Sequence, residues 1–166
     1  MTFLLAAVGA TVMALMELTV GPYLRIGAAE PHLVLVIGIV VTVALGLEIG
    51  LTWGFVGGLA LDVLAQRPLG STAFALLLCL GATDLAARFL VHLRPLIPII
   101  VTFPVSVAYS MILFVAFNAL RTPIPLDDPL GLIVPSAIYD LVLATIVGPL
   151  AISIHDRRGL VERTEW

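Results

Sequence analysis

The sequence contains no lysine, and Cys79 is its one cysteine. Without lysine, a phosphate-binding loop of the GxxxxGK[ST] type cannot form, because its lysine contacts the phosphates. A lone cysteine cannot make an internal disulfide, so it does not indicate a redox compartment. The three histidines lie far apart in the sequence, and no HExxH or CxxC motif occurs. The chain therefore offers no clustered metal ligands, and we expect no metal and no cofactor.

Charge is also scarce. Charged residues make up 11% of the 166 residues, about half the fraction usual in soluble domains. Hydrophobic residues make up 61%, and the mean hydropathy is +1.17. The N-terminus is apolar from the start and lacks the positive region of a secretory signal, so we expect it to be a retained span. The composition indicates an integral membrane protein.

The apolar segments predict an all-α fold with six transmembrane helices in one domain, residues 1–154. A span needs about 20 apolar residues to cross the bilayer core. The block at 32–65 is too long for one crossing and too short for two full ones, so we expect two short spans divided at Glu48. The other spans are predicted at 2–20, 72–91, 96–119 and 131–154, and a short polar tail at 155–166 follows.

Six spans place both termini on one side of the membrane. With the termini inside, five arginines lie on the inner side and three on the outer side. The inner set is Arg88, Arg94, Arg157, Arg158 and Arg163, and the outer set is Arg25, Arg67 and Arg121. Because cytoplasmic loops carry an excess of positive charge, we expect both termini, and the tail, in the cytoplasm.

A glycine ladder is the most informative pattern. Gly46, Gly50, Gly54 and Gly58 recur every four residues, and the next step is Asp62. Each step drifts by about 40° around a helix, so Gly54, Gly58 and Asp62 can share a face while Gly46 and Gly50 are better suited to a turn near Glu48. Small residues at this spacing let membrane helices approach closely. The ladder therefore predicts a helix-packing groove with one polar anchor.

A second row of small residues lies on the first predicted span, at Ala6, Ala10 and Ala14. It would suit close packing against another helix, either within the chain or from a partner.

Acids at membrane depth are costly and usually have a partner or a task. Asp62 either caps a helix end beside Arg67, or holds a loop or docks a partner helix. Glu17 lies either at the headgroups or in a polar cluster near the same surface. Asp84 and Arg88, four residues apart, suit an ion pair at a helix end or a contact with a partner.

Asp140 lies deeper than these, about nine residues into the last predicted span. At this depth a carboxylate needs a hydrogen-bond partner. Tyr109, Ser106 and Asn118 on the fifth predicted span are candidates, which would make an internal network. The alternative is a contact with a ligand or a partner protein.

We considered one enzyme class, a membrane protease with paired aspartates, given Asp62 and Tyr139-Asp140. The presenilin-like motifs would require the opposite order. A lipoprotein signal peptidase would need an aspartate in the segment Phe117–Arg121, which has none. The sequence therefore predicts no catalytic residue and no enzyme.

The segment Trp-Gly-Phe-Val-Gly-Gly-Leu-Ala-Leu-Asp, residues 53–62, followed by Pro68-Leu-Gly, resembles the rod shape-determining protein MreD family. The pattern places the family motif on Gly54, Phe55, Gly58, Leu59, Asp62, Leu69 and Gly70. The resemblance implies a non-enzymatic scaffold in the bacterial inner membrane, with a bitopic MreC-like partner. It also implies work with RodA and a class B penicillin-binding protein in peptidoglycan synthesis, and indirectly with MreB filaments.

That family also resembles the S subunits of energy-coupling-factor vitamin transporters, which are six-helix proteins of similar size. The resemblance to the S subunits implies their six-helix fold, and it leaves a vitamin-binding S subunit as an alternative function. Our hypothesis for the scaffold is lateral binding, in which a partner's helix packs on the groove at Gly54 and Gly58 and Asp62 fixes its register.

Overall fold

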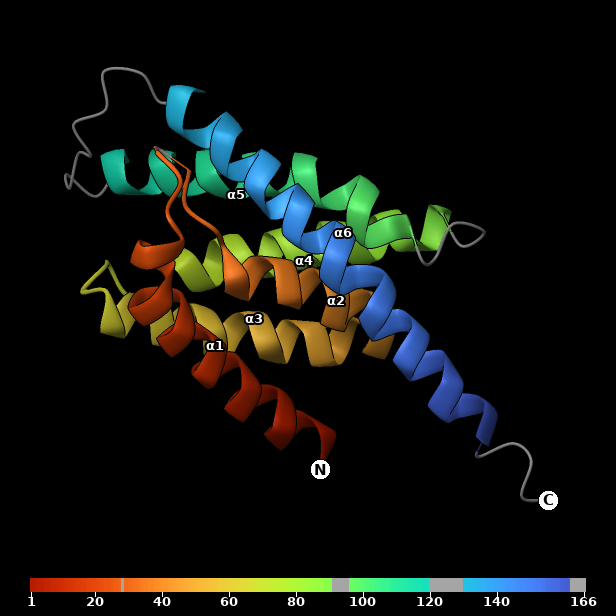
Figure 1. The fold of residues 1–166 in the computed structure, drawn as a ribbon. Coiled ribbons are helices and arrows are strands. Elements are labelled where there is room, and N and C mark those ends of the chain that lie inside the picture. Colours follow the sequence, from red (N-terminus) through yellow and green to blue (C-terminus); the bar gives the residue numbers. More distant parts are fainter. Residues whose placement is uncertain (28, 91–95, 120–129, 162–166) are drawn as a thin grey trace.

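The protein is a bundle of α-helices in a computed structural model that describes residues 1–27, 29–90, 96–119 and 130–161 (Figure 1). Five helices have the length and composition to cross a membrane, so the chain is a multi-pass membrane protein. The residues that follow α1 and the loop at 65–70 lie at one end of the bundle, away from the N-terminus and from the C-terminal end of α6. The helices are α1 (Thr2–Leu24), α2 (Leu33–Leu45), α3 (Leu47–Leu64), α4 (Ser71–Phe89), α5 (Ile97–Ala119) and α6 (Leu130–Val161).

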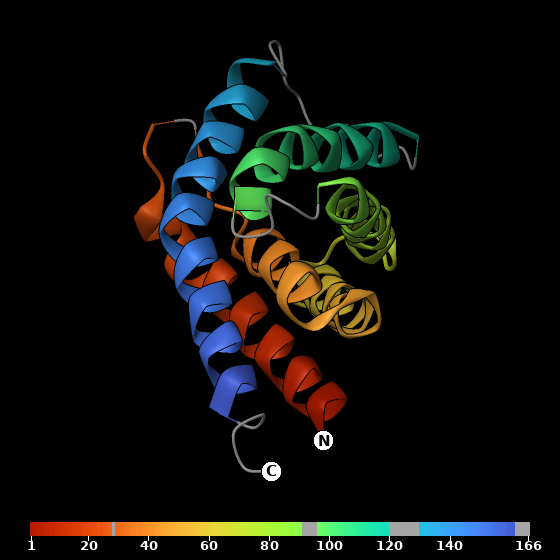
Figure 2. The ribbon, with the colours of Figure 1, turned by 90° about the vertical axis from the view of Figure 1, so that its right-hand side faces the viewer.

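The short helix α2 lies at the centre of the bundle. Its 13 residues reach about 20 Å, which is less than the bilayer core of about 30 Å. It packs against all five other helices, which surround it in Figure 2. Of the six expected spans, five are candidate spans, and one of the two short spans expected at 32–65 is a helix that lies inside the bundle.

The break between α2 and α3 falls at Gly46, where the sequence predicts a turn, and not at Glu48, where it divides the two spans. Gly46 has a φ of +98°, a conformation that glycine adopts without steric cost. Glu48 lies in the first turn of α3 instead, where a negative charge suits the positive end of the helix.

The glycine ladder packs α3 against helices of the same chain. A Cβ atom added at Gly54 would lie 2.7 Å from Cδ1 of Leu80 in α4, and one at Gly58 would overlap the backbone of Ala73 in α4. A Cβ at Gly50 would overlap Thr42 of α2. The groove that the sequence predicts is thus filled by α4 and α2, and it is not open to a partner helix.

The alanine row of α1 also packs within the chain. Ala6, Ala10 and Ala14 are buried, and α1 packs on α3 and α2. A Cβ at Gly9 would lie 3.0 Å from the ring of Trp53, which shows how closely α1 and α3 approach. The opposite face of α1 is apolar and exposed, as expected for a helix that faces lipid.

The predicted polar tail begins as a continuation of α6, which runs to Val161. Residues 162–166 lie outside the described part of the chain, as do residues 92–95 and 120–129 between the predicted spans.

Candidate functional site

The helix α2 begins inside the bundle, so its first backbone N–H groups need acceptors there. Asp140 of α6 accepts from the N–H of His32 through Oδ1, at 2.8 Å. Glu17 of α1 accepts from the N–H of Val34 through Oε2, at 2.7 Å. Both carboxylates also lie at the positive end of the α2 dipole. The structure therefore places Glu17 in an internal polar cluster rather than at the headgroups alone.

Asp140 has two further partners. It is fully buried, its Oδ2 lies 2.7 Å from Nδ1 of His32, and it accepts a hydrogen bond from the hydroxyl of Ser106. The ring of Tyr109 meets the His32 ring edge-on, with 5.2 Å between centroids. Of the three predicted partners, Ser106 binds Asp140 directly and Tyr109 reaches it through His32. Asn118 donates instead to a carbonyl oxygen of its own helix.

His32, just before α2, is electrostatically coupled to these acids. Burial lowers the pKa of His32, but the hydrogen bond and charge of Asp140 and the charge of Glu17 outweigh it, so the pKa is raised above its usual value. The Nδ1 of His32 lies 2.7 Å from Oδ2 of Asp140 across the start of α2. The pair joins α2 to α6, two elements far apart in the sequence.

Asp62 accepts hydrogen bonds from the backbone N–H groups at the start of α4, as Asp140 and Glu17 do at the start of α2. It is fully buried and accepts from the N–H of Gly70 at 2.8 Å, the N–H of Thr72 at 3.1 Å and the hydroxyl of Ser71 at 3.3 Å. Gly70 has a φ of +89°, which favours glycine at this turn. Asp62 therefore holds the loop between α3 and α4. Of the alternatives left open for Asp62, the hydrogen bonds support the holding of the loop. Its carboxylate makes no ion pair with Arg67, whose backbone N–H donates to the Asp62 carbonyl.

Replacing Asp62 with alanine should leave the first N–H groups of α4 without acceptors. We expect a loss of about 2–4 kcal/mol of stability for Asp62→Ala and about half of that for Asp62→Asn, which keeps one acceptor oxygen. Thermal unfolding in mild detergent, followed by the fluorescence of the buried Trp53 in a Trp166→Phe background, measures both. Equal stability of the two variants would contradict the capping role.

The ion pair predicted between Asp84 and Arg88 is confirmed. The Nε of Arg88 lies 2.8 Å from Oδ2 of Asp84, and the arginine is largely exposed. An exposed pair of this kind contributes little stability, so it serves the end of α4 rather than the core.

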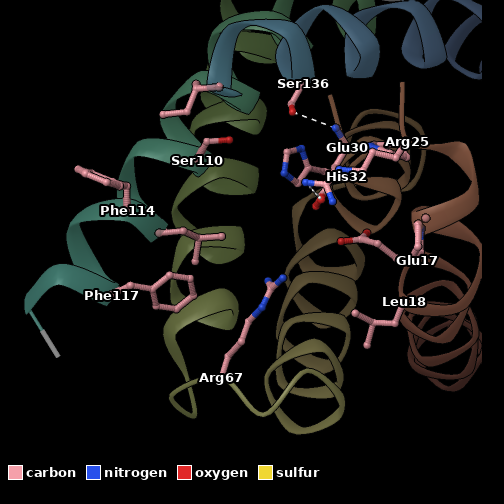
Figure 3. Close-up of a pocket in the computed structure, with 15 residues that line it drawn as sticks. Glu17, Leu18, Arg25, Glu30, His32, Arg67, Ser110, Phe114, Phe117 and Ser136 are labelled. Atoms are coloured by element: carbon pink, nitrogen blue, oxygen red, sulfur yellow. Dashed lines mark hydrogen bonds and ion pairs between the residues drawn. The ribbon is translucent and has the colours of Figure 1, made fainter. Parts of the chain in front are cut away.

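A pocket of about 290 Å³ lies beside the start of α2 (Figure 3). Helix α1 forms one side, α5 and α6 form the other, and the loop at 25–32 and Arg67 complete it. Apolar side chains include Leu18, Leu113 and Phe117.

The polar groups of the pocket differ in whether they are already paired. Arg25 pairs with Glu30 at 2.7 Å, and the N–H of Glu30 donates to the Ser136 hydroxyl at 3.1 Å. The side chains of Arg67 and Ser110 also line the pocket, and neither makes a hydrogen bond or ion pair with the described residues. In Figure 3 the Arg67 side chain rises from its loop into the pocket, with Glu17 across from it.

Sequence reasoning missed His32 and Arg67 as members of the site. The signal for His32 was its position directly before an apolar helix, but its partner Asp140 is 108 residues away. Arg67 was predicted only to lie on the outer side near Asp62, and no local pattern shows that its side chain lines a pocket.

The remaining motif residues lie on the outside of the bundle. Phe55 is half exposed on α3, Leu59 is partly exposed one turn further along, and Leu69 is exposed in the loop before α4. Their side chains are therefore available to lipid or to another protein.

The chain matches the model of one protein family, described as rod shape-determining protein MreD, over residues 1–153. No curated protein matches it. No solved structure matches it either, so the expected likeness to transporter S subunits stays a prediction.

Proposed function

We propose, because this chain belongs to the rod shape-determining protein MreD family, that it is a non-enzymatic scaffold of the cell-elongation machinery. Membership implies a role in determining rod shape. The proposal adds the partners: a bitopic MreC-like protein, RodA with a class B penicillin-binding protein for peptidoglycan synthesis, and MreB filaments indirectly. It also places the protein in the bacterial inner membrane with both termini in the cytoplasm.

The scaffold role is supported by what the buried carboxylates bind, which is the backbone at helix starts. Asp62 and Asp140 are fully buried, and both bind backbone N–H groups just before or at a helix start. Glu17 does the same at α2. Groups that hold helix ends in place make a bundle rigid, and a rigid bundle presents a fixed surface to partner helices.

The partner surface that we propose lies on the outer side of α3. The inner side of α3 is filled by α4 and α2, so a partner must use another face. Phe55, Leu59 and Val63 follow one another at four-residue spacing and are exposed or partly exposed. Two of them, Phe55 and Leu59, belong to the pattern that resembles the family motif, although neither is needed to fill the core. We assign this stripe to the MreC-like helix.

Co-purification in mild detergent with a tagged MreC-like protein of the same organism tests the proposal. We expect a stable complex with the wild-type protein and about tenfold weaker recovery with Phe55→Ala, because aromatic anchors dominate interface energies. Ile146→Ala on α6 is the matched control, since Ile146 is similarly exposed and lies outside the stripe. Failure of the wild-type protein to form a complex would overturn the scaffold proposal, and equal recovery of both variants would overturn the assigned stripe.

One observation favours a second candidate, the vitamin-binding S subunit. The pocket beside α2 is of a size that a small molecule can occupy. In this case a vitamin would raise the unfolding temperature of the protein, because a ligand that binds only the native state stabilises it. No complex with the MreC-like protein, together with such stabilisation, would favour this function over the scaffold.

A further inference from the structure

We propose that the pocket between α1 and α5/α6 binds the phosphate-bearing headgroup of a membrane phospholipid. The shared chemistry is a phosphodiester that accepts hydrogen bonds from Arg67 and Ser110. Such a site is compatible with either candidate function, because it requires neither a partner protein nor transport.

The unused hydrogen-bond donors of the pocket point to a phosphate. Arg25 pairs with Glu30 at 2.7 Å, whereas the Glu17 carboxylate accepts from the N–H of Val34 and lies in the field of Arg67. Arg67 is partly buried, and its guanidinium makes no hydrogen bond or ion pair among the described residues. Its N–H groups therefore remain available to a ligand that accepts hydrogen bonds. A planar guanidinium matches two oxygens of a phosphate, which makes that anion a suitable partner.

A second free donor faces the same space. Ser110 on α5 lines the pocket, and its hydroxyl has no partner among the described residues. Across the pocket, Glu17 uses Oε2 to bind Val34, and its side chain points toward Arg67 in Figure 3. A headgroup with a hydroxyl or ammonium group beyond the phosphate can therefore donate to Glu17 while the phosphate accepts from Arg67. Glycerol and ethanolamine headgroups both have this arrangement.

The size and position of the pocket fit a headgroup better than a whole lipid. Its volume of about 290 Å³ lies at the lower end of the roughly 300–1,000 Å³ typical of ligand sites. It lies where candidate membrane helices end, beside the residues between α1 and α2 and the loop at 65–70, which is where lipid headgroups would meet the bundle. The apolar side chains of Leu18, Leu113 and Phe117 give the first part of the acyl chains a matching wall.

Helices α1 and α5, on the two sides of the pocket, do not pack closely on each other within the described residues. Helix α1 packs on α3 and α2, whereas α5 packs on α6, α4 and α2. The two sides of the pocket are therefore formed by helices whose main contacts are with other neighbours. Lipid chains that leave the pocket between α1 and α5 would enter the surrounding bilayer without crossing the core.

The test measures the unfolding temperature of the purified full chain in detergent as dioleoyl-phosphatidylglycerol is added. We expect a saturable increase for the wild-type protein and an apparent affinity at least about tenfold weaker for Arg67→Gln, since a charge-assisted hydrogen bond is lost. Arg88→Gln is the matched control, because Arg88 pairs with Asp84 outside this pocket. Ser110→Ala, expected to weaken binding less, provides a second variant should Arg67→Gln fold poorly.

Two further probes distinguish the sources of stabilisation. Dioleoylglycerol carries the same chains without a phosphate, and inorganic phosphate carries the anion without chains; we expect little effect from either alone. An equal shift with dioleoylglycerol would overturn the phosphate site, and an equal shift with inorganic phosphate would assign the site to free phosphate and overturn the lipid. The same response in Arg67→Gln, Ser110→Ala and wild-type proteins would also overturn the proposal.

Discussion

Gly58→Leu is expected to prevent formation of the native bundle. A side chain at this position would overlap the backbone of Ala73 in α4, which cannot move aside as a flexible side-chain end can. Overpacking against backbone separates α3 from α4 and weakens the glycine contacts on either side, so we expect a loss of more than about 4 kcal/mol. The yield of monodisperse protein and the unfolding temperature reported by Trp53 measure the effect.

Gly81→Ala is the matched control for this substitution. Gly81 lies inside α4, and a Cβ added there meets nothing within 4 Å. We expect that variant to be as stable as the wild-type protein or slightly more stable, because alanine favours the helix over glycine. A Gly58→Leu protein that folds normally but no longer binds its partner would contradict the internal packing of the ladder. That result would support the lateral groove proposed from the sequence.

Most of the helices could be predicted because hydrophobicity at membrane length is a local property. Residues 96–119 were predicted as a span, and α5 covers 97–119. The length of α2 could not be predicted in this way. Whether an apolar segment of this kind faces lipid or lies inside a bundle depends on the helices around it, and single-sequence hydropathy does not contain that information. The turn expected at Gly46 is confirmed by its φ of +98°, but the division of the two spans was placed at Glu48 because that residue is charged.

The candidate site shows the same limit. The contact between Ser106 and Asp140 was predicted because both lie at suitable depths on consecutive spans, and the structure confirms it. The bond from Val34 to Glu17 was not predicted. It exists because α2 starts below the surface of the bundle, and its exposed N–H groups then require acceptors from other helices. The acids could be recognised as important from the sequence, but the groups that they bind depend on the fold.

Asp140→Ala is expected to have the second large effect. The substitution removes acceptors from the backbone N–H of His32, from its ring and from the hydroxyl of Ser106, all at a fully buried position. Removing one member of a buried pair leaves the other uncompensated, which costs about 3–5 kcal/mol. The unfolding temperature in detergent, with Trp53 as the reporter, measures the loss. Trp53 is suited to this because its indole N–H donates to the carbonyl of Val34, near the start of α2.

Two comparisons separate capping from charge alone. Asp140→Asn keeps the shape and an acceptor for the His32 N–H but removes the negative charge, so it should lose less stability than Asp140→Ala. Asp84→Asn removes an acid from an exposed ion pair, and we expect a loss below about 1 kcal/mol. If Asp140→Ala were no more harmful than Asp84→Asn, the start of α2 would not depend on its cap. Burying a carboxylate costs free energy even where the carboxylate contributes no stability. The polar cluster would then serve a ligand or a partner protein rather than the fold.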